Sequence, residues 1–591
     1  MNLSDIIRCI PHDVFDQACV ILSDGNESSP QKTLTWSQAQ TAFLQHEEWL
    51  LSKLEQLPTR ETYEIIVSYM SNNQSDLFLS VLACTGDAIS KVALPALLNT
   101  RWTAQEVATV LESEQNDGNQ ITMLLYESSF KSKAEKVKQI LRHNCLCLEL
   151  PSFARTLFRS VDVKHINEKK ASPRLSPEEV ADRVDSMSHS NRYSKAALIV
   201  YTSGTTSGSK GVLLSHGAIY VQALAKLQHP CGYSHHTRLL ASTVPFFHVG
   251  GISSILAVWI AGGCLVLPTD TGAKGFDAGL VIKQLSSRTN LNSLVVVPAM
   301  LYSLQQEVTR IARTESKTSG TNVFSKVQLI LVGGQSASPA TLRFVSQTFP
   351  RARLVQTYAC TEAASSLTFL EVLSPERNIR SQYRERSDFP SGDCVGLPPR
   401  HVKICLFDAD PADGSNMRIS QRPKAMGVIA TRGPHIMNGY WKRGNSRVLL
   451  PTSVDHEGNK WLLTNDIGFF DENGQLYFCG RVSDSIRTGG ETVLAGDVER
   501  TLLQHDLIDD CAVFGLKDDR FGEQVCCALV AREKMSLSDV RKWCEKQGLA
   551  GYKRPRKIFY VLELPRNSSG KVLKFRLRER FEEKAKLQSK L

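Results

Sequence analysis

The chain has 591 residues, of which 42% are hydrophobic and 22% are charged, and its formal net charge is +10. This length exceeds what one hydrophobic core usually organises, and the balanced composition excludes a disordered chain, so two or more folded domains are expected. The mild positive charge is spread along the chain without a basic run interleaved with aromatic residues. We therefore expect small anionic ligands rather than nucleic acid as partners.

Neither a disulfide framework nor a membrane span is expected. The 15 cysteines are scattered without a CxxC pair, which is typical of reduced core thiols rather than of a zinc site. Residues 1–15 lack the basic start and apolar stretch of a signal peptide. The most apolar run, residues 251–268 (GISSILAVWIAGGCLVLP), is interrupted by glycines and predicts a buried helix followed by a strand.

Short β-branched runs alternate with helical stretches through most of the chain. The runs at 196–201, 293–297 and 327–332 predict buried strands, and residues 217–228 and 340–348 predict helices. This alternation favours α/β layers with largely parallel sheets. Polar segments rich in turn-forming residues predict surface loops at 314–322, 381–393 and 408–421.

The composition changes near residue 484, where short strands (CAVFGL, CALVA, KIFYVLEL) and two helices predict a separate α+β domain of about one hundred residues. We therefore expect a large domain over residues 1–482 and a smaller one over 483–588. The last three residues, Ser589-Lys590-Leu591, match the peroxisomal address SKL, and the charged helical stretch before them would leave them exposed. They predict a peroxisomal location and the peroxisomal import receptor as a partner. An additional chloroplast pool stays open.

A segment rich in glycine, serine and threonine, residues 201–211 (YTSGTTSGSKG), follows an apolar strand. Its glycines let backbone N–H groups turn toward an anion, its hydroxyls add neutral donors, and Lys210 adds a charge suited to phosphate. A flexible linker has a similar composition, but linkers are seldom wedged between two apolar runs. The segment is not a Walker A loop, because Ser209 stands before the lysine. The predicted phosphate-binding residues are Thr202, Ser203, Gly204, Thr205, Thr206 and Lys210.

These residues resemble the phosphate loop of the adenylate-forming superfamily, which includes acyl-CoA synthetases, firefly luciferases and the adenylation domains of peptide synthetases. The family loop is usually written [YF]TSG[ST]TGxPKG, and this chain departs from it at Ser207 and Ser209. Further motifs follow in the family's order at 245–251 (PFFHVGG), 332–336 (VGGQS), 356–362 (QTYACTE), 461–466 (WLLTND), 480–491 (GRVSDSIRTGGE) and 565–572 (PRNSSGKV). The resemblance spans nearly the whole chain. It implies a large N-terminal domain of layered α/β subdomains with a small β-barrel-like part, and a mobile α+β C-terminal domain.

The resemblance also implies a nucleotide site. Tyr358 would stack on adenine beside the element formed by Gly333, Gly334 and Gln335, and Asp466 and Arg481 would bind the ribose. Thr361 would bind the α-phosphate and Glu362 would ligate Mg²⁺, a hard cation that needs a carboxylate and little else from the protein when phosphates supply its other ligands. Two further departures from the family motifs are Ala359 and Asn465, each in place of glycine. Asparagine is the non-glycine residue that best tolerates a left-handed turn.

The implied reaction has two halves. A carboxylic acid is first joined to AMP from ATP with loss of pyrophosphate, and the C-terminal domain then rotates about a hinge near Ser483 or Asp484 so that the thiol of CoA attacks the acyl-adenylate. Lys571 would neutralise charge in the first half-reaction, and His248 would gate the acyl pocket. Gly489 and Gly490 suit the turn that the C-terminal domain makes on approaching CoA.

Several stretches resemble the plant and algal o-succinylbenzoate:CoA ligases of phylloquinone synthesis more specifically. They lie at 298–300 (PAM), 356–373, 392–396 (GDCVG) and 431–437 (TRGPHIM). The expected substrates are therefore 2-succinylbenzoate, ATP and CoA. A peroxisomal fatty-acyl or 4-coumarate-like CoA ligase is the alternative, and a non-catalytic nucleotide-binding relative is a more remote one. The departures at Ser207, Ser209, Ala359 and Asn465 motivate the last alternative.

Overall fold

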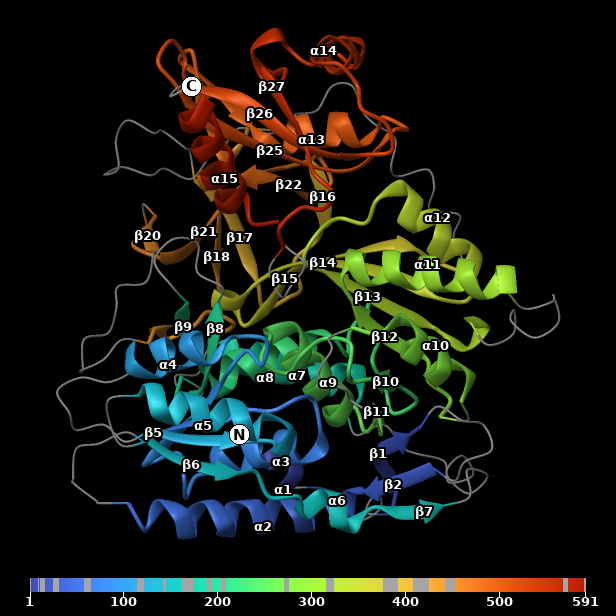
Figure 1. Cartoon of the computed structure of the whole chain (residues 1–591). Coiled ribbons are helices and arrows are strands. Elements are labelled where there is room, and N and C mark those ends of the chain that lie inside the picture. Colours follow the sequence, from blue (N-terminus) through green and yellow to red (C-terminus); the bar gives the residue numbers. More distant parts are fainter. Residues whose placement is uncertain are drawn as a thin grey trace.

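The computed structural model describes residues 2–8, 10, 16–24, 31–57, 65–113, 122–141, 145–161, 175–188, 194–202, 209–269, 276–287, 289–314, 324–375, 392–407, 425–441, 452–455, 457–566 and 572–588. These residues form four sheets with helices packed on them, in a large N-terminal domain and a smaller C-terminal domain at the top of Figure 1. The mixed α/β class expected from the sequence is confirmed. Six predicted functional positions (Ser203, Gly204, Thr205, Thr206, Lys571 and the 589–591 tripeptide) lie outside the described residues, as do most of the three predicted surface loops.

One sheet carries the β8–β9 hairpin at one end. Its strand order is β19 (Gly439–Tyr440), β9 (Lys210–Ser215), β8 (Ala196–Thr202), β4 (Ala93–Leu97), β3 (Ile65–Met70), β5 (Thr122–Tyr126) and β6 (Cys145–Glu149). The strands from β8 to β6 are parallel, whereas β8, β9 and β19 are antiparallel neighbours. All five residues of β4 are buried, as is typical of a parallel strand covered on both faces.

A second sheet runs through the other half of the large domain. Its order is β15 (Ser365–Leu373), β14 (Arg353–Cys360), β13 (Leu329–Gly333), β12 (Ser293–Val296), β10 (Arg238–Leu240), β11 (Cys264–Pro268), β1 (Ala18–Ser23), β2 (Gln31–Thr35) and β7 (Arg159–Val161). The helices of this domain are α1 (Asp5–Arg8), α2 (Trp36–Leu54), α3 (Ser75–Cys84), α4 (Ala104–Ser113), α5 (Lys131–Ile140), α6 (Phe153–Leu157), α7 (Pro177–Ser188), α8 (His216–Ala225), α9 (Val249–Ile260), α10 (Ala278–Ser286), α11 (Pro298–Thr314) and α12 (Pro339–Thr348).

The predicted elements are confirmed with small shifts at their ends. The three β-branched runs become β8, β12 and β13, and the apolar run at 251–268 becomes α9 followed by β11. The helix predicted over 217–228 is α8, which ends at Ala225 with Lys226 as its C-cap. The chain turns there because Pro230 lies four residues further on and cannot continue a helix.

The two remaining sheets are mainly antiparallel. The third contains β16 (Asp393–Gly396), β22 (Leu476–Arg481), β21 (Lys460–Phe470), β18 (Gly427–Arg432) and β17 (Lys403–Phe407), with β20 (Thr452–Val454) beside β21. A 3₁₀ turn at Val482–Asp484 leads into the C-terminal sheet. That sheet comprises β24 (Glu491–Leu494), β23 (Ser485–Thr488), β26 (Gly522–Ala531), β25 (Ile508–Asp518) and β27 (Lys557–Tyr560), accompanied by α13 (Ala495–Leu503), α14 (Leu537–Lys546) and α15 (Lys574–Gln588).

An aromatic cluster fixes α9 within the core of the large domain. Trp259 of α9 packs against Trp36 of α2 with ring centroids 5.9 Å apart, and against Phe78 of α3 at 6.1 Å. Phe78 also packs on Phe246, just before α9, at 4.7 Å. Such contacts add to the stabilisation from burying large rings, so both ends of α9 are held in place.

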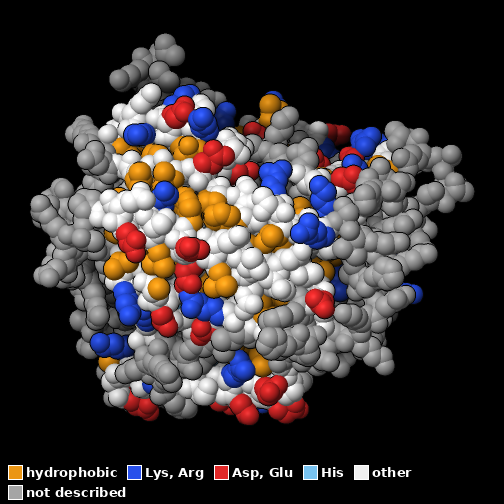
Figure 2. All heavy atoms as spheres, turned by 90° about the horizontal axis from the view of Figure 1, so that it is seen from below, with side chains coloured by type: hydrophobic (Ala, Val, Ile, Leu, Met, Phe, Trp, Pro, Cys, Tyr) orange, Lys and Arg blue, Asp and Glu red, His pale blue; other side chains and the backbone are white. Residues whose placement is uncertain are grey.

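Figure 2 shows the face of the molecule seen from below in Figure 1. Among the coloured residues of that view, lysine and arginine side chains alternate with acidic ones around scattered hydrophobic groups. Within the described part of the chain, no helix combines the length and the apolar character needed to cross a membrane.

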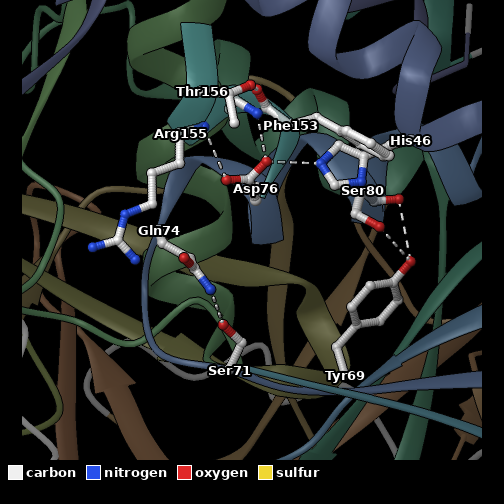
Figure 3. A network of polar contacts seen from close by, with 10 residues as sticks. His46, Tyr69, Ser71, Gln74, Asp76, Ser80, Phe153, Arg155 and Thr156 are labelled. Carbon is white, nitrogen blue, oxygen red and sulfur yellow. Dashed lines mark hydrogen bonds and ion pairs between the residues drawn. The ribbon is translucent and has the colours of Figure 1, made fainter. Parts of the chain in front are cut away.

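A buried carboxylate ties three helices of the large domain together (Figure 3). Asp76, in the first turn of α3, accepts hydrogen bonds from the backbone N–H groups of Ala154 (2.7 Å) and Arg155 (3.3 Å) at the start of α6. Its Oδ1 also lies 3.0 Å from Nε2 of His46 on α2. A negative charge at the N-terminus of a helix satisfies donors that have no partner within the helix.

We expect Asp76→Ala to destabilise the large domain, because two backbone donors and a buried imidazole lose their acceptor. The expected cost is about 3 kcal/mol, seen as a lower urea midpoint for the first unfolding transition followed by circular dichroism. Asp182→Ala, at an exposed position of α7, is the matched control and should leave the midpoint unchanged. Equal midpoints for the two variants would contradict the bridging role.

Candidate active site

The glycine-rich loop is held at its base by a β-hairpin. Thr202, the last residue of β8, pairs with Lys210, the first of β9, and the Thr202 hydroxyl donates to the Lys210 carbonyl at 3.4 Å. A side chain at Gly211 would place its Cβ 3.1 Å from both Ile199 and Trp441. The hairpin therefore packs closely, and Lys210 is exposed at the start of β9.

Glu362 is placed beside this hairpin by Tyr440. The 3₁₀ turn Thr361–Ala363 follows β14 directly, and Oε1 of Glu362 accepts a hydrogen bond of 2.9 Å from the hydroxyl of Tyr440 on β19. Nζ of Lys210 lies 5.3 Å from the centroid of the Tyr440 ring. Lys210, Tyr440 and Glu362 thus form one line across three segments that are distant in the sequence.

The surroundings of Glu362 suit a cation that takes most of its ligands from phosphates. The described residues contain no group of three or more histidine, cysteine, aspartate or glutamate side chains that could hold a metal ion. Glu362 is half-buried, and Tyr440 engages only one of its two oxygens. Magnesium is commonly held by one or two carboxylates together with substrate phosphates, and the remaining oxygen of Glu362 fits that pattern.

A second group of predicted residues meets around Asp466. The hydroxyl of Tyr358 donates to Oδ2 of Asp466 at 2.6 Å, and Nε of Arg481 lies 3.3 Å from Oδ1. The pairing of β21 with β22 sets Asp466 opposite Arg481 in register. Burial and the neighbouring Asp466 carboxylate raise the pKa of Tyr358 well above its usual range, so the phenol stays protonated and donates.

The carboxyl ends of β13 and β14 lie next to one another, with Gly333 paired with Thr357. Loops at such adjacent strand ends are the usual ligand-binding edge of an open α/β sheet. Gly334 has a φ of +91°, which L side chains rarely adopt. Gln335 follows it at the surface, so the predicted adenine element sits at the same edge as Tyr358.

His248 is the N-cap of α9, and among the described residues its buried Nε2 has no hydrogen-bond partner. Burial, together with the nearby charge of Arg101, lowers the pKa of His248 to about 4. The imidazole is therefore neutral near pH 7, as a group lining a pocket for an acyl chain would be. Its ring packs against that of Phe247, with the centroids 4.7 Å apart.

The C-terminal domain meets the predicted adenine element through Arg566, which lies shortly before Lys571 in the sequence. Residues Arg566 and Val572 form an antiparallel bridge at the base of the segment that carries this lysine. Nη1 of Arg566 lies 3.3 Å from Oε1 of Gln335, and Nη2 lies 2.6 Å from Oδ2 of Asp510 within the C-terminal domain. Gly489 and Gly490, with φ of +61° and +86°, form the two-residue turn between β23 and β24.

The backbone conformations of Asn465 and Ala359, which replace glycines of the family motifs, are compatible with their side chains. Asn465 has a φ of +60°, the left-handed conformation that asparagine tolerates, whereas Ala359 continues β14 outside that region.

The sequence did not predict Tyr440 or Arg566 as site residues. Tyr440 belongs to none of the family motifs. Arg566 lies inside the motif at 565–572, but the resemblance implies a role only for Lys571 in that motif.

The profile of the AMP-binding enzyme family matches residues 19–441, and that of the AMP-binding enzyme C-terminal domain matches residues 497–571. The chain belongs to the AMP-binding enzymes. The 2-succinylbenzoate–CoA ligase, chloroplastic/peroxisomal, of Arabidopsis thaliana is 33% identical over 393 residues, which are 64% of this chain and 66% of that protein. The matched part thus spans about two thirds of the plant relative's length. The 2-succinylbenzoate–CoA ligase of Bacillus cereus strain AH820 is 30% identical over 389 residues, 66% of this chain and 71% of the relative.

Solved structures share the fold of this AMP-binding enzyme along almost its entire length. The o-succinylbenzoate CoA synthetase of Bacillus subtilis in complex with its acyl-adenylate intermediate superposes with a TM-score of 0.68 at 23% identity, over 98% of this chain and 97% of that chain. ATP-bound MatB of Rhodopseudomonas palustris gives a TM-score of 0.72 at 19% identity, over 98% and 99%. At these identities the likeness concerns the fold.

We predict that Tyr440→Phe weakens the binding of Mg·ATP by about 3- to 10-fold, the net value of one ordinary hydrogen bond. The aromatic ring beside Lys210 remains, so ATP binding in EDTA should be unchanged. Isothermal titration calorimetry with and without Mg²⁺ measures both. Tyr302→Phe, at a side chain that is 58% exposed on α11, is the matched control. Equal losses with and without the metal would contradict a role for Tyr440 in orienting Glu362.

Proposed function

We propose that this AMP-binding enzyme is an ATP-dependent acid:CoA ligase that converts 2-succinylbenzoate into its CoA thioester through an acyl-adenylate, as in the synthesis of phylloquinone. The observation that carries the choice of acid is the likeness to the Arabidopsis and Bacillus ligases of that name. The arrangement of Lys210, Glu362 and Asp466 supports the nucleotide-dependent chemistry.

The proposed roles of the nucleotide-binding residues follow from their positions. Tyr358 provides a ring for adenine next to Gly333, Gly334 and Gln335, while Asp466 offers carboxylate oxygens to the ribose hydroxyls beside Arg481. The hairpin loop from Thr202 to Thr206, together with Lys210, offers backbone donors and a positive charge to the phosphates. Thr361 adds a hydroxyl where β14 ends.

In the first half-reaction an oxygen of the substrate carboxylate attacks the α-phosphorus of ATP, and the bond to the β,γ-pyrophosphate breaks. Mg²⁺ held by Glu362 would neutralise phosphate charge during this transfer. Lys210 and Lys571 stabilise negative charge on the transferring group. In the second half-reaction the CoA sulfur attacks the acyl carbon, the thiol loses its proton, and AMP leaves with the electron pair of the acyl–oxygen bond.

The two half-reactions share one cleft, and we propose that residues 483–588 move as a body relative to residues 1–482. The 3₁₀ turn at Val482–Asp484 is the connection between them. The contact between Arg566 and Gln335 holds the base of the Lys571 segment near the nucleotide edge, which suits adenylation. Rotation would replace that segment by the turn at Gly489 and Gly490, through which CoA would approach.

The proposed location is the peroxisome. The support is the tripeptide Ser589-Lys590-Leu591, read by an import receptor where it is a free carboxyl terminus, and the name chloroplastic/peroxisomal of the Arabidopsis relative. The receptor is then the protein partner of this chain, beside its small-molecule substrates.

An acid-substrate panel tests the proposed function. The purified protein, Mg·ATP and CoA are incubated with 2-succinylbenzoate, 4-coumarate or a medium-chain fatty acid, and AMP and thioester formation are measured. We expect turnover with 2-succinylbenzoate to exceed that with the other acids by at least about 100-fold, because a pocket with matched polar groups rejects acids that leave them unpaired. Strong turnover of 4-coumarate with none of 2-succinylbenzoate would favour the 4-coumarate-like alternative, and no turnover at all would favour a non-catalytic relative.

Lys571→Ala separates the two half-reactions. We expect adenylation to fall by at least about 100-fold, since the lysine acts on charge in that transfer, while CoA attack on a supplied acyl-adenylate continues nearly unchanged. Single-turnover assays of pyrophosphate release and thioester formation measure the two steps. Lys546→Ala, at an exposed position of α14, is the control. Equal loss in both steps would contradict the assigned role.

A further inference from the structure

A lysine lies in the interior of the large domain at the junction of α8, α9 and β15. Lys226 is the C-cap of α8, and only 1% of its surface is exposed. The helices α8 and α9 pack on one another and both contact β15 (Figure 1). All residues of α8 are buried, so the ammonium group of Lys226 is surrounded by a largely apolar layer.

Two serine hydroxyls contact the ammonium group. Nζ of Lys226 donates to Oγ of Ser253 on α9 and to Oγ of Ser365 at the start of β15, the latter at 3.3 Å. The Ser253 hydroxyl donates to the backbone carbonyl of Val249 at 2.7 Å and lies 3.0 Å from the Ser365 hydroxyl, whose own proton stays available for a further acceptor. An ammonium group has three donors, so one remains for a further acceptor.

No negative charge balances Lys226 within the described part of the chain. No aspartate or glutamate there pairs with Nζ. Burial raises the pKa of the neighbouring Cys231 thiol to about 12 and lowers the pKa of His401 well below its usual range, so both groups are uncharged near neutrality. Burial also lowers the pKa of Lys226 to about 8, which still leaves it mainly protonated at pH 7. A buried cation without a counter-ion is costly, and an anionic ligand that binds there would remove this cost.

The position of this cation relates it to the acid rather than to the nucleotide. Ser365 stands three residues after Glu362, and Ser253 stands five residues after His248, about 7.5 Å along α9. Gln222, one turn before Lys226, donates from Nε2 to the carbonyls of Ala363 (2.9 Å) and Ser366 (2.8 Å). The C-terminal end of α8, which carries Lys226, is therefore hydrogen-bonded to the turn that carries Glu362.

We propose that Lys226, together with the hydroxyl of Ser365, binds the carboxylate of a dicarboxylic acid that is not joined to AMP, while Ser253 holds both groups in place. This inference rests on the proposed function and names the residues that select its substrate. The bound carboxylate accepts the third hydrogen bond of the ammonium group and neutralises the buried charge. A monocarboxylic acid would leave that charge unpaired, so the same group rejects fatty and phenylpropanoid acids.

The test compares a dicarboxylic acid with monoacids of the same skeleton. The probes are 2-succinylbenzoate, 4-oxo-4-phenylbutanoate and 2-butyrylbenzoate, each monoacid lacking one of the two carboxylates, and pyrophosphate release gives kcat/KM for each. The reference is the monoacid that the wild-type enzyme activates. In Lys226→Met, the ratio of kcat/KM for the diacid to that for the reference should fall by roughly 10- to 100-fold, the value of a charge-assisted hydrogen bond. Methionine is apolar and similar in length, so the buried position can accept it.

Gln222→Met is the matched control from the same buried face of α8. It removes the hydrogen bonds to Ala363 and Ser366 without changing charge, so it should lower kcat/KM for both acids by the same factor. An equal loss for both acids in Lys226→Met would show that the lysine only holds the turn, and would overturn the proposal. An unchanged ratio with full activity would overturn it as well.

The outcome for the proposed function is read from the wild-type enzyme alone. If another dicarboxylic acid proves to be the substrate, that acid and its monoacid take the place of the probes, and the ratio in Lys226→Met still tests the lysine. If the wild-type enzyme prefers 2-succinylbenzoate but the ratio of kcat/KM for the diacid to that for the monoacid is unchanged in Lys226→Met, the proposed function is supported and the proposed role of Lys226 is wrong.

Discussion

The antiparallel pairing of β19 with β9 is the contact on which the arrangement of the site depends. The backbone N–H groups of Asn438 and Trp441 donate to the carbonyls of Leu213 (2.8 Å) and Gly211 (2.6 Å). The backbone N–H of Met437 donates to the backbone carbonyl of Glu362 (2.9 Å). The backbone of residues 437–441 therefore aligns the β8–β9 hairpin with the 3₁₀ turn that carries Glu362. Side-chain contacts such as Tyr440 with Glu362 follow from this alignment, and none of them could form if the two segments were not already in register.

Local patterns in the sequence were sufficient to predict the helices and strands, but not the tertiary contacts between them. The β-branched runs predicted β8, β12 and β13 because such residues fit buried parallel strands. Family motifs predicted which residues gather around Asp466, and the left-handed backbone at Asn465 followed from its side-chain chemistry. The roles of Tyr440 and Lys226 were not predicted, because their side chains contact segments that are distant in the sequence. A local sequence pattern does not show which distant segments come into contact.

Asp466 and Lys226 differ in how their charges are satisfied. Asp466, at the proposed nucleotide site, is already engaged by Tyr358 and Arg481, so its geometry is fixed before any ligand arrives. Lys226, at the proposed acid site, has only neutral partners in the described part of the chain. If both proposals hold, a rigid site serves the nucleotide chemistry and an unbalanced charge distinguishes one acid from another.

Arg566 contacts Gln335 of the large domain and Asp510 of its own domain at the same time. In the proposed rotation the first contact is lost, whereas Asp510 travels with the arginine. The guanidinium group therefore retains this counter-ion throughout, and the motion exchanges a hydrogen bond to a neutral amide for one to water. Such an exchange costs about 1 kcal/mol, so this contact favours one orientation only weakly. The population of each orientation is then set by what occupies the cleft, first ATP and afterwards the acyl-adenylate.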